Sequence, residues 1–348
     1  MSDLIAVRPD EGFDVDSLVA WLRTAPDLPG GTPHVAQFGG GKANLTYLLT
    51  FPGGAELVLR RPPRGPVAPG SHDMGREFRV LSRLWKSFDK APRAVAYCRD
   101  ETVIGSEFVL MERRDGVVVR GVIPEIFGGG EDPRQNRLLS EVVIDTLAEF
   151  HSVDPGSCDL DDLGRPEGFL LRQVEGWSDR WEKAKHEENE LANEVGSWLR
   201  AALPPEGRIA LLHNDWRLDN MAVASDDPGS CVAVYDWDMT TRGDPLADLG
   251  TLMGSWFDPG EAPGELSMMP TQSQGWMSRR DAVSRYMRLT GADRTHIDWY
   301  LVFGAWKLAV ILQQIYIRWL RGQTQDDRFA SLDEGARHLF RLAGERRP

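Results

Sequence analysis

The sequence is poor in cysteine and has no excess of positive charge. Its three cysteines, Cys98, Cys158 and Cys231, are odd in number and far apart. A disulfide framework or a zinc knuckle is therefore not expected, and a reducing compartment fits. The formal net charge is −13, and because phosphate backbones bind clustered Lys and Arg, we expect no nucleic-acid partner. The acidity is compatible with a cationic substrate, but it also favours solubility.

Signals for export or membrane insertion are scarce as well. The first residues lack a basic segment followed by an apolar one, so we expect a cytoplasmic protein. One run, residues 299–320, is long and apolar, but Lys307 near its middle would cost roughly 2.5–3.5 kcal/mol in a bilayer. We therefore expect a buried helix there and no membrane partner.

The chain does contain enough apolar sequence for a large core, with 348 residues of which 41% are hydrophobic, and this suits two domains or one bilobal unit. Alternating, β-rich segments separated by Gly turns predict a small antiparallel sheet up to about residue 113, with one helix at residues 76–88. After Gly116 helical patterns dominate. They are interrupted by two short predicted strands, residues 208–215 and 231–238, which we expect to form a hairpin.

This hairpin carries the polar residues that suggest chemistry. Strand alternation puts Asp236 on the same face as Val232 and Val234, and a hairpin would bring it near Asp215 and Asn220. Two carboxylates and an amide oxygen suit Mg²⁺ and suit zinc poorly. The order H-x-D-x-x-x-x-N followed by a strand-borne Asp is the signature of phosphoryl transfer, which needs metal ligands and a further Asp to orient the attacking hydroxyl. The alternative is a polar hairpin with Asx turns at both ends.

Seven motifs in order, over roughly residues 30–320, resemble the aminoglycoside phosphotransferase-like kinases, the APH and choline kinase type. They are similar in particular to the kinase-like domains fused to some acyl-CoA dehydrogenases. The motifs are "GGGKANLTYLL", "LVLRRPP", "HDMGREFRVL", "FVLMERRDG", "HNDWRLDNM", "VYDWDMTTRGDPLADLG" and "KLAVILQQIYIRW". The resemblance implies an α+β, bilobal, protein-kinase-like fold. A nucleotide-binding lobe with an antiparallel sheet would span residues 1–113, with a hinge near 111–116, and a mainly helical lobe with the catalytic hairpin and the acceptor site would span 114–348.

The resemblance also implies roles in the second lobe. Asp215 would be the catalytic base, or at least the residue that orients the substrate hydroxyl. Asn220 and Asp236 would bind Mg²⁺. Asp244 is expected to be the N-cap of a helix that starts with Pro245, and Asp248 is expected to brace the loop's backbone. His213 would be a structural hydrogen-bonding residue. Arg217 would contact the transferred phosphate or be a solvated loop cation. Asp238 would be an assisting acid.

In the first lobe, the phosphate-binding cation of the family falls at Arg60. Arg60 shares a strand face with Val58, whereas Arg61 would point the other way. Glu77 would pair with Arg60, although it can also be read as a surface helix carboxylate. The family also implies nucleotide contacts in a Gly-rich turn over the phosphates, at Gly40, Gly41 and Asn44. This turn is not a Walker A loop. At the hinge, the implied contacts come from Met111, Glu112 and Arg114.

The expected activity is ATP- and Mg²⁺-dependent transfer of the γ-phosphate to a hydroxyl of a small molecule, with GTP not excluded. The acceptor would be aminoglycoside-like, an amino alcohol, a sugar or a hydroxyacyl compound. A pseudokinase that binds nucleotide without transferase activity is the main alternative, and a metal-dependent hydrolase is another. A protein kinase fits less well, because "HNDWRLDN" and "DWD" depart from the wording of its motifs. The sequence does not define the oligomeric state.

Overall fold

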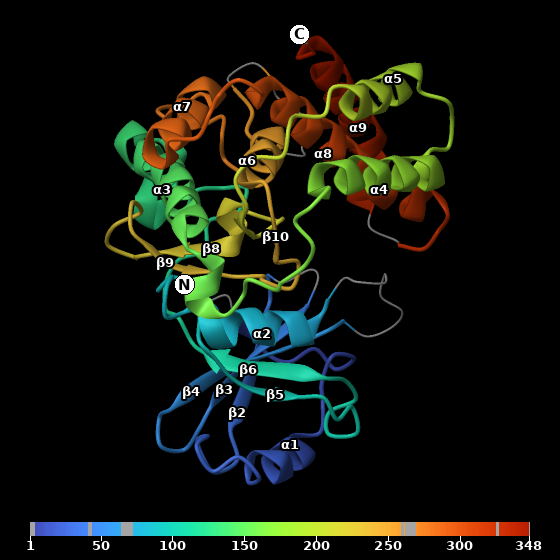
Figure 1. The fold of residues 1–348 in the computed structure, drawn as a ribbon. Helices are drawn as coiled ribbons and strands as arrows, with labels where there is room; N and C mark the ends of the chain where they lie inside the picture. Colours follow the sequence, from blue (N-terminus) through green and yellow to red (C-terminus); the bar gives the residue numbers. More distant parts are fainter. Residues whose placement is uncertain are drawn as a thin grey trace. The chain divides into compact units, whose positions relative to one another are not determined.

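The computed structural model describes residues 4–40, 44–63, 72–258, 261, 269–324 and 327–347. They form two compact units (Figure 1). Unit 1 consists of Met1–Asp115, Cys158–Leu160 and Val232–Thr240, and unit 2 of Gly116–Ser157, Asp161–Cys231 and Thr241–Pro348. The two units are therefore not separated at one point in the sequence, because the segment that carries Asp236 and Asp238 belongs to unit 1.

Unit 1 is built on a six-stranded antiparallel sheet with the strand order β1-β2-β3-β4-β6-β5. One face buries Tyr47, Leu59 and Leu110 against helix α1, and helix α2 packs on β5 and β6 (Figure 1). The elements are β1 Leu4–Ile5, α1 Val15–Leu22, β2 His34–Phe38, β3 Leu45–Thr50, β4 Glu56–Arg61, α2 Met74–Leu84, β5 Ala94–Cys98 and β6 Phe108–Glu112.

The antiparallel sheet and the helix near residues 76–88 are confirmed, but unit 1 has a second helix that the sequence analysis missed. Helix α1 is eight residues long and begins after Asp14, whose side chain accepts a hydrogen bond from the N–H of Asp16. Leu18 and Leu22 are four residues apart and both are buried. The cap and the i,i+4 apolar pair were the available signals.

Unit 2 is mainly helical, and with the antiparallel sheet of unit 1 this confirms the α+β class. The predicted pairing of the two short strands is wrong. Strand β7 pairs with β10, with Leu212 opposite Thr241, and not with β9, the strand that leads to Asp236. A further three-residue strand, β8, forms a two-stranded sheet with β9. The strands are β7 Ala210–Leu212, β8 Met221–Val223, β9 Cys231–Val234 and β10 Thr241–Gly243.

The helices of unit 2 gather around α8, which packs against α4, α5, α6 and α9. The contact with α6 needs glycine. A Cβ at Gly304 would lie 1.7 Å from the carbonyl oxygen of Gly250, and one at Gly254 would lie 2.6 Å from the carbonyl oxygen of Gly304. The helices are α3 Pro133–Ser152, α4 Phe169–Ala184, α5 Glu190–Ala201, α6 Pro245–Gly254, α7 Arg279–Thr290, α8 Ile297–Leu320 and α9 Leu332–Glu345, with the 3₁₀ turns Glu125–Gly130, Pro155–Cys158, Leu218–Asn220 and Asp327–Ser331.

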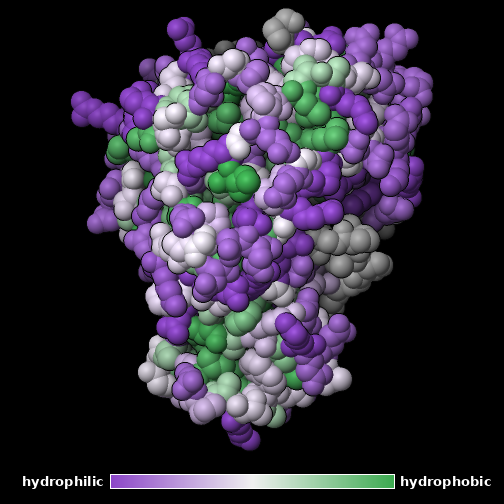
Figure 2. Space-filling model, viewed as in Figure 1, coloured by the Kyte–Doolittle hydropathy of each residue, from purple (hydrophilic) through white to green (hydrophobic). Residues whose placement is uncertain are grey.

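Helix α8 is the apolar run noted in the sequence. It is long and apolar enough to cross a membrane by length and composition. In unit 2 most of its side chains are buried, including those of Lys307 and Gln313, which confirms the prediction of a buried helix. On the face shown in Figure 2, hydrophilic residues predominate and the apolar areas are scattered.

Candidate active site

The catalytic loop predicted in unit 2 follows β7, whose three residues are all buried. His213 is fully buried. Asn214 has a φ of 68°, a left-handed conformation that Asn tolerates better than most residues. Asp215 follows with a partly exposed carboxylate. The side-chain N–H groups of Asn220 donate to the carbonyl oxygen and to Oδ2 of Asp215, both at 2.9 Å. Asn220 thus closes the loop and holds Asp215.

The backbone of this loop is anchored by Asp248 on α6. Its carboxylate accepts the N–H of His213 at 2.6 Å and the N–H of Asn214 at 2.9 Å. The predicted bracing role of Asp248 is confirmed. So is the N-cap at Asp244, which accepts the N–H of Leu246 at the start of the same helix.

Two buried residues that the sequence analysis missed extend this network. Nε2 of His151 on α3 lies 3.4 Å from Oδ2 of Asp248, and Nδ1 of His151 lies 2.7 Å from the hydroxyl of Tyr286 on α7. Burial acts to raise the pKa of Asp248, but the hydrogen bond and charge of His151, with a smaller contribution from His213, hold that pKa below its usual value. A polar His at the end of an apolar helix was the available signal in the sequence.

Arg217 lies within ion-pair distance of two carboxylates of the same loop. Its Nε is 3.2 Å from Oδ1 of Asp215 and 3.4 Å from Oδ1 of Asp219. Burial raises the pKa of Asp219, with Asp215 adding to the effect and Arg217 opposing it. Arg217 is therefore not a freely solvated side chain, and a contact with transferred phosphate stays a prediction.

In unit 1 the predicted cation lies in a buried ion-pair cluster. Nε of Arg60 is 3.0 Å from Oε2 of Glu77, and its terminal nitrogen donates to Oδ1 of Asp236. Glu77 is 1% exposed, so its reading as a surface carboxylate is wrong and its pairing with Arg60 is confirmed. Arg61 points to the other face of β4, where it donates to the backbone carbonyls of Ile104 and Glu11.

The segment after β9 carries both acids of the "DWD" motif. Asp236 has a φ of 69°, and the indole N–H of the buried Trp237 donates to the carbonyl of Val234. Oδ2 of Asp238 accepts from the side-chain N–H of Asn44 at 3.0 Å. This contact joins Asp238 to the Gly-rich turn, of which Gly40 and Asn44 are described and Gly41 lies outside the described residues.

Two carboxylates thus contact the guanidinium of Arg60, and that of Asp238 acts on it electrostatically. Burial raises the pKa of Glu77 to about 8, Asp236 and Asp238 act in the same direction, and Arg60 opposes them. The pKa of Asp238 is also raised, first by burial and then by the charge of Asp236. The pKa of Arg60 is higher than usual, because the carboxylates outweigh its burial. Burial and the neighbouring carboxylates raise the pKa of Glu77 and of Asp238, and a divalent cation held by oxygen ligands would relieve the repulsion between the carboxylates.

Asn220 fits the same metal chemistry. Both described hydrogen bonds of its side chain use the amide N–H groups, which leaves the amide oxygen as the side-chain atom that can meet a cation. No group of three or more His, Cys, Asp or Glu side chains suited to a metal is found among the described residues. The predicted ligand set has one Asp and one Asn and relies on phosphate and water oxygens for the rest, and it stays a prediction.

The predicted adenine contacts lie at the end of β6. Met111 is buried. The backbone N–H of Glu112 donates to the carbonyl of Arg93 at 3.0 Å, so of its two backbone groups only the carbonyl can meet a base. Within the described part of the chain no hydrogen bond uses the N–H of Arg114, while its carbonyl accepts from the hydroxyl of Tyr235 at 3.4 Å. The nucleotide role of these residues stays a prediction.

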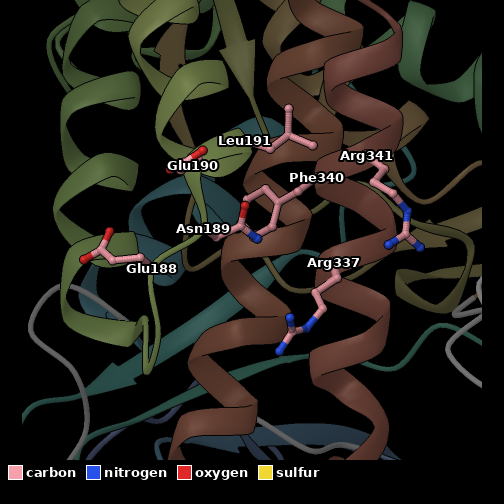
Figure 3. A pocket seen from close by; sticks show the side chains of 7 residues that line it. All are labelled: Glu188, Asn189, Glu190, Leu191, Arg337, Phe340 and Arg341. Atoms are coloured by element: carbon pink, nitrogen blue, oxygen red, sulfur yellow. The ribbon is translucent and has the colours of Figure 1, made fainter.

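A surface pocket of about 370 Å³ lies elsewhere in unit 2 (Figure 3). Arg337, Phe340 and Arg341 of α9 form one side of it, and residues 188–191 at the start of α5 form the other. None of the residues predicted for catalysis or nucleotide binding lines it, so this pocket is not the predicted active site.

Comparisons with known proteins agree with this geometry. The human acyl-CoA dehydrogenase family member 11 is 32% identical over 336 residues, which cover 94% of this chain. The mouse acyl-CoA dehydrogenase family member 10 is 29% identical and covers 91% of it. The chain spans 42% and 30% of the length of these two relatives.

Solved structures match over nearly the whole chain. A crystal structure of a putative aminoglycoside phosphotransferase from Ralstonia eutropha is 28% identical, with a TM-score of 0.80 over 96% of this chain and 98% of that one. The aminoglycoside phosphotransferase APH(4)-Ia shares the fold at 15% identity, with a TM-score of 0.58 over 93% of this chain and 98% of its own. The model of the phosphotransferase enzyme family matches residues 34–276. The motifs, the fold and these matches together identify the chain as a member of the phosphotransferase enzyme family.

Proposed function

We propose that this protein transfers the γ-phosphate of ATP to a hydroxyl group of a small molecule. The observation that carries the proposal is the arrangement of Asn220, which gives its N–H groups to Asp215 and keeps its oxygen for a cation. One side chain thus orients the predicted base and supplies a metal ligand. Asp215, Asn220 and Asp236 are all present, so the loss of residues expected of a pseudokinase is not seen.

In the proposed reaction, Arg60 and the Gly-rich turn bind the phosphates of the nucleotide. Asp236 and Asn220 would hold Mg²⁺, which neutralises charge on the phosphate oxygens. Asp215 orients the acceptor hydroxyl and receives its proton. The hydroxyl oxygen forms a bond to the γ-phosphorus while the bond to the oxygen that bridges to the β-phosphorus breaks, and ADP leaves. The chain acts mainly by positioning the reactants and stabilising charge.

The comparisons support the use of a nucleotide and a small acceptor. APH(4)-Ia was solved in a ternary complex with AMP-PNP and hygromycin B, and aminoglycoside 2'-phosphotransferase-IIIa was solved in complex with GDP. ATP is therefore our first choice and GTP the second. The likeness to acyl-CoA dehydrogenase family members supports hydroxyacyl compounds among the candidate acceptors, beside amino alcohols and sugars.

The test is a screen for acceptor-dependent ADP release with Mg²⁺ and ATP, followed by mass spectrometry of the product. The panel contains aminoglycosides, sugars, amino alcohols and hydroxyacyl compounds. We expect at least one acceptor to yield a phosphomonoester in equal amount to ADP, and we expect aminoglycosides to be poor acceptors. Tight ATP binding without ADP release across the panel would instead support a pseudokinase. Free phosphate formed without an acceptor would support a hydrolase, and fast phosphorylation of kanamycin would overturn the expectation on aminoglycosides.

A further inference from the structure

A buried lysine in unit 2 has no role in the reaction described so far. Lys307 lies in the middle of α8 and is 5% exposed. Its Nζ donates to Oγ1 of Thr251 at 3.3 Å, and that hydroxyl in turn donates to the carbonyl of Ala247. No other hydrogen bond and no ion pair of Lys307 occurs within the described residues. An ammonium group has three donors, so two of them have no described acceptor.

The arrangement is unfavourable for the isolated protein. Burying a charge without a partner costs free energy. Burial lowers the pKa of Lys307, and the carboxylates of Asp248 and Asp215 oppose this from beyond ion-pair distance. Asp215 is thus near enough to act on Lys307 electrostatically, which locates the lysine in the neighbourhood of the predicted base within unit 2.

The indole N–H of Trp177, beside Lys307, is a further donor without a described acceptor. Nζ of Lys307 is 5.4 Å from the ring centroid of Trp177 on α4, the helix that packs on α8 (Figure 1). Trp177 is 7% exposed, and its indole N–H is buried without an acceptor in the described structure. The guanidinium carbon of Arg180 lies 4.4 Å from the same ring centroid. Arg180 is exposed and has no described ion pair.

Two cations therefore lie against the indole ring of Trp177, whose own N–H is buried without a described acceptor, and no described carboxylate pairs with either cation. The chain as a whole is acidic, with a net charge of −13, so this concentration of unpaired donors is not a consequence of composition. Donors without acceptors are complementary to an anion, and a bound anion would remove the cost of burying Lys307.

We propose that Lys307, Trp177 and Arg180 form a binding site for an anionic group, a carboxylate or a phosphate, carried by the acceptor. The proposal rests on the proposed function in one respect: the molecule that carries the anionic group is taken to be the acceptor of the phosphate. An anionic acceptor differs from the cationic substrate with which the acidic composition is compatible. Lys307 acts as a positioning residue, since it holds the acceptor by a group that does not react.

The first test measures anion binding without turnover. Inorganic phosphate and acetate are titrated separately into the full chain by calorimetry, with a non-hydrolysable ATP analogue and Mg²⁺ present at saturating concentration so that phosphate cannot enter the γ-phosphate position. We expect one or both anions to bind the wild type, and we expect Lys307→Met to weaken binding at least about tenfold, as expected for loss of a charged hydrogen bond. Trp177→Phe, which keeps the ring and removes the N–H, should weaken binding less. The matched control is Arg341→Gln, which removes an exposed Arg of α9.

The stability of Lys307→Met separates a binding role from a structural one. Met has a similar length and no charge, so we expect the variant to melt at a higher temperature than the wild type in the absence of anion. A lysine that served the fold would give the opposite sign. Failure of both anions to bind the wild type, or unchanged binding by Lys307→Met, would overturn the proposal whether or not the protein has kinase activity.

The second test uses the reaction. Acceptors are compared in sets that share one hydroxyl and differ in the other end, which is a carboxylate, a phosphate ester or a neutral alcohol. We expect the anionic members to have the lower KM, and the better of the two anions identifies the group that the site takes. Lys307→Met should raise KM for the anionic acceptor at least about tenfold with little change for the neutral one. Turnover of neutral or cationic acceptors, with no KM effect of Lys307→Met on any of them, would leave the phosphotransferase function intact and refute the anion site.

Discussion

The two units contribute their predicted active-site residues in different ways. In unit 1, Arg60 contacts both Glu77 and Asp236, and burial together with the neighbouring carboxylates raises the pKa of Glu77. In unit 2, Asp215 accepts hydrogen bonds from Asn220, pairs with Arg217 of the same loop, and lies on a loop whose backbone is anchored on Asp248. The first arrangement responds to the charge of a ligand. The second fixes geometry before any ligand arrives, as a residue that orients a hydroxyl requires.

The largest effect should come from the helix contact that supports the anchored loop. Gly304→Ala would put a Cβ 1.7 Å from the carbonyl oxygen of Gly250 on α6, the helix that carries Asp248. The backbones must separate, and we expect the free energy of unfolding to fall by about 3 kcal/mol, measured by urea denaturation. The control is Gly176→Ala in α4, where a new Cβ meets nothing within 4 Å. Equal stability of the two variants would contradict the close α6–α8 contact.

The next largest effect should come from the anchor itself. Asp248→Asn keeps the size of the side chain but replaces one of the two acceptors for His213 and Asn214 by a donor. We expect a loss of about 2 kcal/mol in stability together with a fall in kcat. Nucleotide affinity should stay unchanged, because unit 1 keeps its contacts. The control is Asp179→Asn, an exposed carboxylate on α4. A variant that binds nucleotide more weakly but turns over normally would show that Asp248 does not act through the loop.

Neighbouring arginines on opposite faces of β4 give a sharper comparison within unit 1. Arg60→Gln should weaken ATP binding by about 2 kcal/mol, or roughly thirtyfold, because a charged phosphate contact is lost. Arg61→Gln should leave ATP affinity unchanged and lower stability, since Arg61 donates to the carbonyls of Glu11 and Ile104. Calorimetric titration and thermal unfolding of both variants measure the difference. Equal effects on ATP binding would remove the assignment of Arg60.

The smallest predicted effect is the pH dependence of Lys307. Burial lowers its pKa in the folded protein below the 10.5 of the unfolded chain, so the unfolded state holds the proton more tightly. The free energy of unfolding of the wild type therefore gains a contribution as pH rises through the folded pKa towards 10.5. Lys307→Met lacks this contribution. We expect its stability advantage over the wild type to be largest at neutral pH and to disappear above pH 10.5, and an advantage independent of pH would contradict the burial of a charged amine.

The sequence predicts those features that depend on local pattern. Strand alternation predicts that Arg60 and Arg61 face opposite ways, and the Asp-Pro pair predicts the cap of α6 at Asp244. The bracing by Asp248 and the pairing of Glu77 with Arg60 were inferred from motif order and are found in the structure. The assignment of ATP, Mg²⁺ and catalytic roles remains a proposal.

The sequence does not reveal which strands and side chains pair when they are far apart in the chain. Strands β7 and β10 have three residues each, too few to reveal their register, and the sequence therefore favours β9 as the partner of β7. The contacts of His151 with Asp248 and Tyr286 join three helices that are far apart in the sequence. The position of His151 at the end of an apolar helix is a local signal, but nothing local marks its two partners. Lys307 was noticed because it interrupts an apolar run, but its neighbour Trp177 could be found only in the folded chain.

The central claim is that Asp215, held by Asn220 and the anchored loop, orients the acceptor for transfer of the γ-phosphate. The most direct measurement is single-turnover transfer of labelled γ-phosphate from ATP to an acceptor identified in the screen, by the wild type and by Asp215→Asn, with ATP affinity measured in parallel. We expect the variant to bind ATP as the wild type does and to transfer phosphate about a thousandfold more slowly. Transfer at a near-normal rate by Asp215→Asn would contradict the account.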